Sequence, residues 1–463
     1  MPTTEPAVYA PPESAKNIDL PPPRATRVRY GVLGLSIAMA ILLYLDRFAL
    51  NAVQPIVMEE LGINLTMMGW VTSTFFWAYA LAQVPAGWLG DRWGGRNTLA
   101  LYVAVWSVAF ALQALAFNFW ILIALRIVQG IAQAGAYAVT ASFLKNWIEP
   151  GLRGFANSSV SMGGRAGKVL TDIITPRLIL LLLPAMVALG YTTGNEPGRW
   201  REAFLIYGAL GLVWSWVFWR WFRNTPAEHP GVNAAELKII YQGEAKPVTV
   251  AHAPAPPFVK VLANRNLWLL SGIMFFVNVG WIFLATSLAT YLNTVFGWSL
   301  VKAGSYSALT AIFGMAGCLA GGFTTDWLSS RFGELWGRRL PGVISCGGAA
   351  AMYVVALNLQ EPEYVVYAFA CVYFLSDFLL GALWSTVQDV GRRNAGAMFG
   401  FINMSGNLGA AIFPPVIGML VKSQNWSGVF MASAAAFCVS LTLWFFVDPR
   451  VKLPEVAQPA IAD

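Results

Sequence analysis

The sequence predicts an all-α integral membrane fold with twelve transmembrane helices in two six-helix halves. Hydrophobic residues make up 57% of the 463 residues and charged residues only 11%, whereas soluble domains carry about 25% charged residues. Apolar runs of spanning length, about 20 residues, recur twelve times along the chain. The longest interior polar stretch divides these runs six and six.

The apolar runs define the expected helices in order. They cover residues 30–54, 67–90, 98–118, 120–144, 154–189, 201–222, 266–292, 301–323, 341–359, 363–386, 396–421 and 427–447. The run at 154–189 is long for one span and contains Pro176 and Pro184. A kink or an extension beyond the membrane is therefore expected there.

Polar segments complete the domain organisation. Residues 1–29 are Pro-rich and polar, which is typical of a disordered tail. The stretch between the halves contains six prolines, which is typical of a linker, and residues 234–240 can form a short surface helix. The expected segments are a cytoplasmic tail at 1–29, a first half at 30–222, a cytoplasmic linker at 223–265, a second half at 266–447 and a cytoplasmic tail at 448–463.

Lysine and arginine gather in alternate loops, which predicts the orientation. Both termini are expected on the cytoplasmic side by the positive-inside rule, in a multi-pass protein of the cytoplasmic (inner) membrane. The net charge of +7 therefore does not indicate a nucleic-acid partner. One chain holds both halves, so a monomer is expected to suffice. The bases are Arg24, Arg27, Arg29, Arg92, Arg96, Lys145, Arg153, Arg220, Arg223, Arg331, Arg338, Arg339, Arg392, Arg393, Arg450 and Lys452.

A related motif follows the second helix of each half. In the second half, glycines at 321–322 precede Asp326 and Arg331. Small residues allow close helix packing, and an Asp at a helix end can pair with a following Arg. We expect a gate that latches cytoplasmic helix ends; the alternative is a solvated loop. The first-half gating residues are Gly87, Gly90, Asp91, Arg92, Gly94 and Arg96.

Two six-helix halves with such a repeat resemble the major facilitator superfamily. A narrower resemblance is to its anion:cation symporter branch, whose members carry organic anions. It implies a secondary transporter that moves an organic anion, such as a sugar acid or related carboxylate, by alternating access. The matching runs are Tyr44-Leu45-Asp46-Arg47 with Leu50, Arg126-Ile127-Val128-Gln129-Gly130, Gly163-Gly164-Arg165 and Asn224-Thr225-Pro226-Ala227-Glu228-His229-Pro230.

Helical periodicity gathers polar side chains into stripes on four first-half helices. Facing lipid, such stripes are costly, so they are expected to line a central cavity. Four bases (Arg47, Arg126, Arg165, Lys168) outnumber two acids (Asp46, Asp172), and this excess predicts a bound anion. The stripes contain Tyr44, Arg47, Asn51 and Gln54; Thr72, Phe76, Tyr79 and Gln83; Arg126, Gln129, Gln133, Tyr137 and Thr140; and Ser158, Ser161, Arg165, Lys168, Asp172 and Thr175.

Guanidinium groups grip carboxylates bidentately, so Arg47 and Arg126 are the expected primary ligands, the role that the resemblance also implies. Some candidates have structural alternatives. Aromatic residues can be packing residues, Asn407 can bridge helices, and Arg165 and Lys168 can pair with Asp172, which follows Lys168 by one helical turn. The further expected substrate-binding residues are Tyr44, Tyr79, Gln129, Gln133, Arg165, Trp384, Asn403 and Asn407.

Asp46 is the expected proton carrier, since Arg47 and a low-dielectric cavity act on it in opposite directions; the alternative is a structural ion pair. Many proton-coupled members of the branch carry a Glu where this chain has Gln133, and an amide cannot titrate. Asp172 or Asp377 is expected to substitute, or fewer protons move.

Three other functions stay open at this point. An anion exchanger or facilitator would not need Asp46 to titrate. A membrane-embedded enzyme would need intramembrane histidine or a metal cluster, but His229 and His252 lie in the linker. We therefore expect no enzyme activity, no metal and no cofactor beyond the proton gradient. A long soluble tail would favour a transporter-like receptor, and the expected tails of this chain are short.

Overall fold

The computed structural model describes residues 24–149, 152–188, 200–241, 261–391, 395–423 and 425–452. The side chains of Asp91 and of residues 183–188 are not among those described. The predicted tails beyond these ranges, most of the linker after 241, and Arg392 and Arg393 also lie outside the described residues. The described chain is built of helices joined by short turns.

The first half begins with α1 and ends with α8. Its helices are α1 (Val28–Ala52), α2 (Gln54–Leu61), α3 (Leu65–Trp93), α4 (Gly95–Gln113), α5 (Phe119–Gln133), α6 (Ala136–Trp147), α7 (Arg153–Ala188) and α8 (Trp200–Trp221). A short 3-10 helix (Pro226–Glu228) and α9 (Ala234–Tyr241) follow in the linker. The second half contains α11 (Arg265–Thr286), α12 (Leu288–Phe296), α13 (Leu300–Asn358), α14 (Pro362–Gly391), α15 (Ala395–Lys422) and α16 (Trp426–Trp444).

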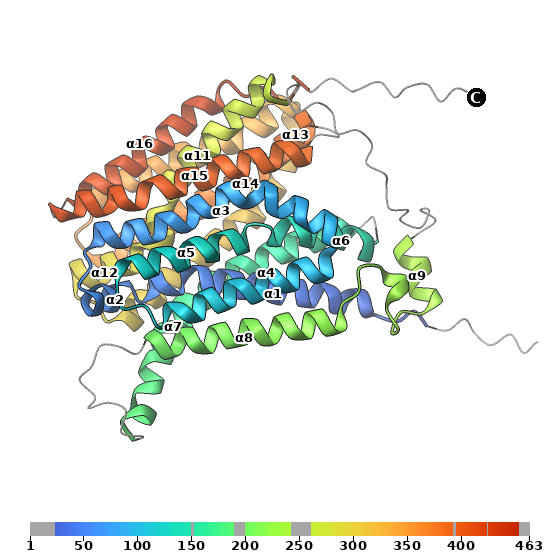
Figure 1. Ribbon diagram of the computed structural model, residues 1–463. Coiled ribbons are helices and arrows are strands. Elements are labelled where there is room, and N and C mark those ends of the chain that lie inside the picture. The colour runs from blue at the N-terminus through green and yellow to red at the C-terminus, as the bar shows by residue number, and fades with distance from the viewer. Residues whose placement is uncertain are drawn as a thin grey trace, which may run out of the picture.

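The two halves lie side by side as helical bundles (Figure 1), with α3 against α15 and α7 against α13. The helix α9 and the beginning of α1 lie at one end of the bundle. The short helices α2 and α12 lie at the opposite end. We call these the α9 end and the α2 end.

Local sequence explains where several helices begin and end. Asn64 caps α3 by accepting from the backbone N–H of Met67 at 2.9 Å, and Asn118 caps α5 in the same way at 3.0 Å from Ile121. Such side chains satisfy N–H groups that have no partner within the helix. Gly94 (φ +77°) separates α3 from α4, and Gly333 (φ +76°) breaks α13. The break at Gly94 lies within the motif of the first half, and the break at Gly333 follows the motif of the second half.

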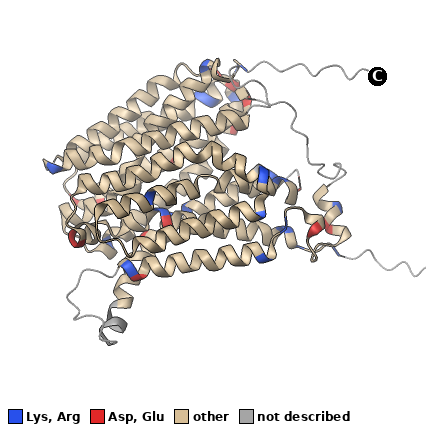
Figure 2. Ribbon diagram, viewed as in Figure 1, with Lys and Arg blue, Asp and Glu red and all other residues tan. Residues whose placement is uncertain are grey.

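The surface is that of a membrane protein. Large apolar side chains such as Leu205, Val213 and Trp216 are exposed on α8, and charged residues are sparse in the middle of the bundle (Figure 2). Among the described residues, nine helical stretches are long and apolar enough to span a membrane. One stretch joins α5 and α6, and another is the broken α13. The prediction of an all-helical membrane protein is confirmed, whereas the count of twelve and the side of the termini stay predictions.

The halves pack closely at the α2 end. Ser73 of α3 donates to the carbonyl of Ala411 of α15 at 2.5 Å. A Cβ on Gly69 would lie 2.7 Å from the carbonyl carbon of Pro414. On the other seam, Arg177 of α7 donates to the Ser305 hydroxyl of α13 at 3.0 Å. Close backbone approach at glycine therefore joins the halves at this end.

Gly69→Leu is expected to open the α3–α15 contact, because overpacking costs about 1–3 kcal/mol. Maleimide labelling of Ser73→Cys, in a background without the native cysteines, should then become about tenfold faster, since 1.4 kcal/mol is tenfold. The matched control is Gly34→Leu, because a Cβ there meets nothing within 4 Å. Unchanged labelling in Gly69→Leu would contradict the packing described.

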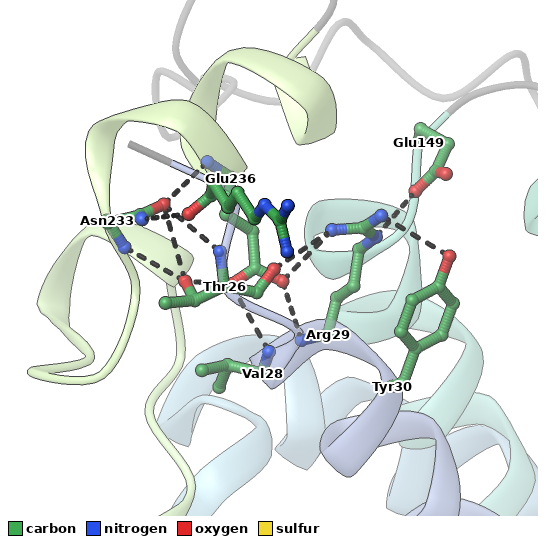
Figure 3. Close-up of polar contacts among 8 residues, drawn as sticks. Thr26, Val28, Arg29, Tyr30, Glu149, Asn233 and Glu236 are labelled. Carbon is green, nitrogen blue, oxygen red and sulfur yellow. Dashed lines mark hydrogen bonds and ion pairs between the residues drawn. The ribbon is translucent and has the colours of Figure 1, made fainter. Parts of the chain in front are cut away.

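The linker helix α9 is fixed to the first half by Glu236 (Figure 3). This fully buried carboxylate accepts from the Thr26 hydroxyl at 2.5 Å and from the backbone N–H groups of Val28 and Arg29 at 3.2 and 3.1 Å. The Arg29 guanidinium also donates to Glu236 at 3.1 Å and pairs with Glu149 at 3.3 Å. No side chain caps α1 from its own N-cap residue, so Glu236 supplies that cap from the linker.

Glu236→Ala is expected to lower the free energy of unfolding by about 1.5–3 kcal/mol, the range for hydrogen bonds to a charged group. Burial alone would raise the pKa of Glu236, but hydrogen bonds from Thr26, Arg29 and Val28 outweigh burial and lower the pKa below its ordinary 4.5. Because the pKa of Glu236 is lower in the folded state, its ionised carboxylate stabilises the fold above pH 4.5. This contribution is lost as the pH falls through the folded-state pKa.

Thermal unfolding in detergent at neutral and acid pH checks this expectation. The difference between wild type and Glu236→Ala should be present at pH 7 and shrink below pH 4.5. The control is Glu228→Ala, an exposed glutamate in the same linker. Equal melting temperatures at pH 7 would show that Glu236 does not fix the linker.

Candidate functional site

A cavity of about 280 Å³ lies between the two halves. From the first half it is lined by α1, α3, α6 and α7, and from the second half by α11, α13, α14 and α15. Several of the predicted residues line it: Tyr44, Arg47, Tyr79, Arg165, Asp377, Trp384, Asn403 and Asn407. Helices far apart in the sequence thus bring cationic, hydroxyl, amide and aromatic groups to one cavity.

Arg47 projects from α1 into an aromatic corner of the cavity. Its guanidinium carbon lies 4.5 Å from the centroid of the Tyr79 ring and 5.2 Å from that of Tyr44. Its Nε donates to Oε1 of Gln133 at 3.1 Å, while Nη2 is buried without a hydrogen-bond partner among the described residues. No described carboxylate pairs with Arg47. The Arg47 guanidinium is thus held by aromatic faces and an amide, and its Nη2 has no hydrogen-bond acceptor among the described residues.

Arg126 lies behind Arg47 and does not line the cavity, which differs from the expectation for a primary ligand. It is fully buried and donates to the backbone carbonyl of Arg47 at 3.3 Å and to Oε1 of Gln129 at 3.0 Å. Its Nε and Nη2 have no partner among the described residues. Arg126 therefore adds a second positive charge close to Arg47.

Gln129 and Gln133 also lie outside the cavity wall. Gln129 donates to the carbonyl of Asp46 at 3.0 Å, and Gln133 donates to the carbonyl of Leu43 at 3.3 Å. Both amides thus hold α5 against α1. Periodicity places them on one face with Arg126, but it does not tell whether that face meets a cavity or a neighbouring helix.

Asp46 points away from Arg47 and from the cavity. Adjacent residues on a helix differ by about 100° in direction, and Asp46 turns towards α4 and α8, where Trp106 and Gly211 approach it. Asp46 is fully buried, and neither carboxylate oxygen has a hydrogen-bond partner among the described residues. The neighbours in sequence do not form an ion pair in this structure.

Two acids form ion pairs with basic side chains of α7. Asp172 pairs with Lys168 one turn away and accepts from the Ser307 hydroxyl of α13 at 2.7 Å. Asp377 of α14 pairs across the halves with Arg165 of α7, at 2.9 Å from Nε. The alternative in which Lys168 pairs with Asp172 describes this structure, whereas Arg165 has a different partner.

The second-half amides and ring form the opposite wall. Asn407 donates to the carbonyl of Asn403 at 2.7 Å, one turn earlier on α15. The Trp384 ring lies 4.2 Å from that of Phe399. Sequence reasoning missed Asn278, Trp281, Tyr373 and Ser376, which also line the cavity. Asn278 could have been found as an amide in the middle of the apolar run of α11. Tyr373 and Ser376 could have been found because they lie within about one helical turn of Asp377 on α14.

The gating motif packs within the first half. A Cβ on Gly90 would clash with Val139 of α6, and Gly87 faces Ala138. After the turn at Gly94, Arg96 donates to the carbonyl of Trp219 at 2.7 Å and its backbone N–H donates to Asn224 at 2.9 Å.

The two remaining residues of the gating motif are Arg92 and Asp91. The Arg92 guanidinium carbon lies 5.5 Å from the centroid of the Trp88 ring. The side chain of Asp91 lies outside the described ones. A latch between the halves therefore stays a prediction.

The fold and the cavity define a class of protein. The family model described as Major Facilitator Superfamily matches residues 37–395, so the chain belongs to this superfamily and is a secondary transporter, not an enzyme. The described residues contain no cluster of three or more His, Cys, Asp or Glu side chains that could hold a metal ion.

Particular relatives sharpen this assignment. The chain is 28% identical to a probable sulfoacetate transporter of Cupriavidus necator, over 94% of this chain and 97% of that protein. It is also 28% identical to a probable galactarate/D-glucarate transporter of Escherichia coli K12, with the same coverage of 94% and 97%. These relatives confirm the resemblance to the anion-transporting branch.

A solved structure supports the fold. An inward-facing, unoccupied bacterial homolog of the human lysosomal transporter Spinster matches with a TM-score of 0.74 and 19% identity, over 91% of this chain and 97% of that one. This confirms the predicted major facilitator fold.

Proposed function

We propose that the protein carries an organic anion, a sugar acid or related carboxylate, across the cytoplasmic membrane by alternating access, in symport with protons. The observation that carries the proposal is Arg47, a cavity-lining guanidinium with a free Nη2 and no carboxylate partner among the described residues. A buried cation without a counter-charge is energetically costly, and a bound anion would offset that cost. The relatives named above support the same substrate class.

The substrate's hydroxyls would be bound by groups from both halves. Tyr44 and Tyr79 lie beside Arg47, and Trp384, Asn403 and Asn407 line the opposite wall. A ligand that contacts both halves can be exposed to one side of the membrane at a time as the halves rock. Arg126 would act through Arg47, by holding its backbone carbonyl and adding charge, as would Gln129 and Gln133 through α1.

Asp46 is the proposed proton carrier. A charged carboxylate is costly to bury without a partner, whereas the protonated acid is not. The main chain connects it to the site, since Gln129 binds the Asp46 carbonyl and Arg126 binds the Arg47 carbonyl. Protonation of Asp46 would leave Arg47 and Arg126 as an excess positive charge that favours anion entry. Asp172 and Asp377 are the further candidates for coupling.

A second candidate function is anion exchange or facilitated transport without protons. The observation in its favour is Gln133, an amide that accepts from Arg47 at 3.1 Å and cannot titrate. Asp46, outside the cavity, would then be structural.

The proposed topology has twelve spans with both termini cytoplasmic. The nine apolar stretches of the described residues become ten spans when the break at Gly333 divides α13 into two. The helices α3 and α7 would add one span each. The α9 end would face the cytoplasm. The halves would be 30–222 and 266–447 with a linker at 223–265, and the gating motif would lie on the cytoplasmic side. A monomer would suffice.

Uptake of radiolabelled anions into proteoliposomes tests the proposal. The panel contains galactarate, galactonate, glucuronate and sulfoacetate, each with and without an inward proton gradient and in counterflow against unlabelled anion. Symport predicts accumulation that needs the gradient, and exchange predicts counterflow alone. Absence of both for the whole panel would contradict organic-anion transport.

A further inference from the structure

Arg165 and Asp377 form the one ion pair, among the described residues, whose two members both line the cavity. The Nε–Oδ2 distance is 2.9 Å, and Nη2 lies 3.5 Å from Oδ1. We propose, on the basis of the proposed function, that Arg165 is a second anion ligand and that Asp377 occupies it until the substrate's second acidic group displaces the carboxylate. The site is thereby selective for organic dianions over the matching monoanions.

The neighbouring pair on α7 shows why Arg165 is the exchangeable cation. Lys168 and its partner Asp172 are both buried, and Ser307 binds the same carboxylate from α13. Asp377 has no described hydrogen-bond partner other than Arg165, and the side chains of that pair are 12% and 20% exposed. A carboxylate held by one partner at the cavity wall is easier to displace than one fixed from two helices.

The two guanidinium groups belong to one wall of the cavity. Tyr44 and Tyr137 line the same cavity as Arg47 and Arg165, and the Arg47 guanidinium carbon lies 5.2 Å from the centroid of the Tyr44 ring. Gly164 makes this arrangement possible, because a Cβ there would lie 2.7 Å from a ring carbon of Tyr44. Because both guanidinium groups line one cavity of about 280 Å³, a small molecule with an acid at each end would place one end at Arg47 and the other at Arg165.

The charge balance favours a dianion. Lys168 and Asp172 neutralise each other, as do Arg165 and Asp377. Arg47 and Arg126 remain, and a protonated Asp46 does not offset them. A monoanion leaves one positive charge in a poorly hydrated site, and a dianion leaves none.

Binding to the purified full-length protein in detergent tests the inference. Two matched pairs of probes are titrated by calorimetry: galactarate with galactonate, and succinate with succinamate. In each pair one carboxylate is replaced by a neutral group. Wild type should bind the dianion at least about tenfold more tightly, since a charge-assisted hydrogen bond exceeds about 1.4 kcal/mol.

Arg165→Gln should reduce this preference to about threefold or less. Arg165→Lys should be intermediate, because it keeps the charge but not the bidentate fork. Asp377→Asn removes the internal competitor and should tighten dianion binding by about tenfold. Arg177→Gln, which loses a contact between the halves but no cavity charge, should match wild type.

Equal affinity of wild type for both members of each pair, or an unchanged preference in Arg165→Gln, would overturn dianion selectivity while leaving anion transport in place. Weaker dianion binding by Asp377→Asn would overturn the displacement. If Arg165→Gln does not fold, the gain expected in Asp377→Asn decides the matter. Failure of every anion in the wider panel to bind would instead contradict the proposed function, and the inference with it.

Discussion

Arg47→Gln is expected to weaken organic-anion binding at least about thirtyfold and to abolish uptake. Removing one partner of a buried, hydrogen-bonded charge pair costs about 2–5 kcal/mol, and each 1.4 kcal/mol is about tenfold. The neutral amide keeps a donor in the corner formed by Tyr44 and Tyr79 but carries no charge. Calorimetric titration and proteoliposome uptake of the best anion of the panel check this.

Two further variants separate charge from geometry at this position. Arg47→Lys should bind more tightly than Arg47→Gln and less tightly than wild type, because lysine supplies charge without a planar fork. Arg177→Gln serves as the control for a lost arginine outside the cavity wall. Wild-type affinity in a folded Arg47→Gln protein would exclude Arg47 as the anion ligand.

Asp46→Asn is expected to abolish gradient-driven accumulation while counterflow stays within about threefold of wild type. Asparagine resembles the protonated acid in shape and charge, so the anion site should keep its affinity, but no proton can be taken up or released. The measurement compares accumulation under an inward proton gradient with counterflow in the same proteoliposome preparation.

Glu59→Gln, at an exposed position of α2, is the matched control and should keep both activities. Unchanged accumulation in Asp46→Asn would favour the exchanger or facilitator. Loss of counterflow together with accumulation would instead indicate a structural role for Asp46, since exchange does not require its titration.

The helices could be predicted from the sequence because their cause is local. Apolar runs of spanning length, asparagine caps such as Asn64 and glycine breaks such as Gly94 act over a few residues. The predicted run at 154–189 corresponds to a single helix, α7 (Arg153–Ala188). The repeat of the motif also allowed the superfamily to be inferred.

The candidate site could be predicted only in part. Periodicity identifies residues that share a helix face, but the cavity is made where two halves meet. It therefore grouped Arg126 with the cavity residues, although Arg126 lies outside the cavity wall and donates to the backbone carbonyl of Arg47. The pair Arg165–Asp377 joins residues 212 positions apart, and no local pattern reports such a contact.

The neighbours Asp46 and Arg47 show the same limit at short range. Adjacency in sequence suggested an ion pair, but the helix directs Asp46 towards Trp106 and Arg47 towards Gln133. The separation gives the two residues different environments, one buried among α4 and α8 and one in the cavity. This separation is the physical basis for giving them different proposed roles.

A structure determined with the tightest-binding anion of the panel would show whether Arg47 binds the substrate. We expect the anion in the cavity between the halves, with an acidic group within about 2.7–2.9 Å of the Arg47 guanidinium and further contacts to α14 or α15. An anion bound elsewhere, or one that contacts a single half and leaves Arg47 without a ligand, would contradict it.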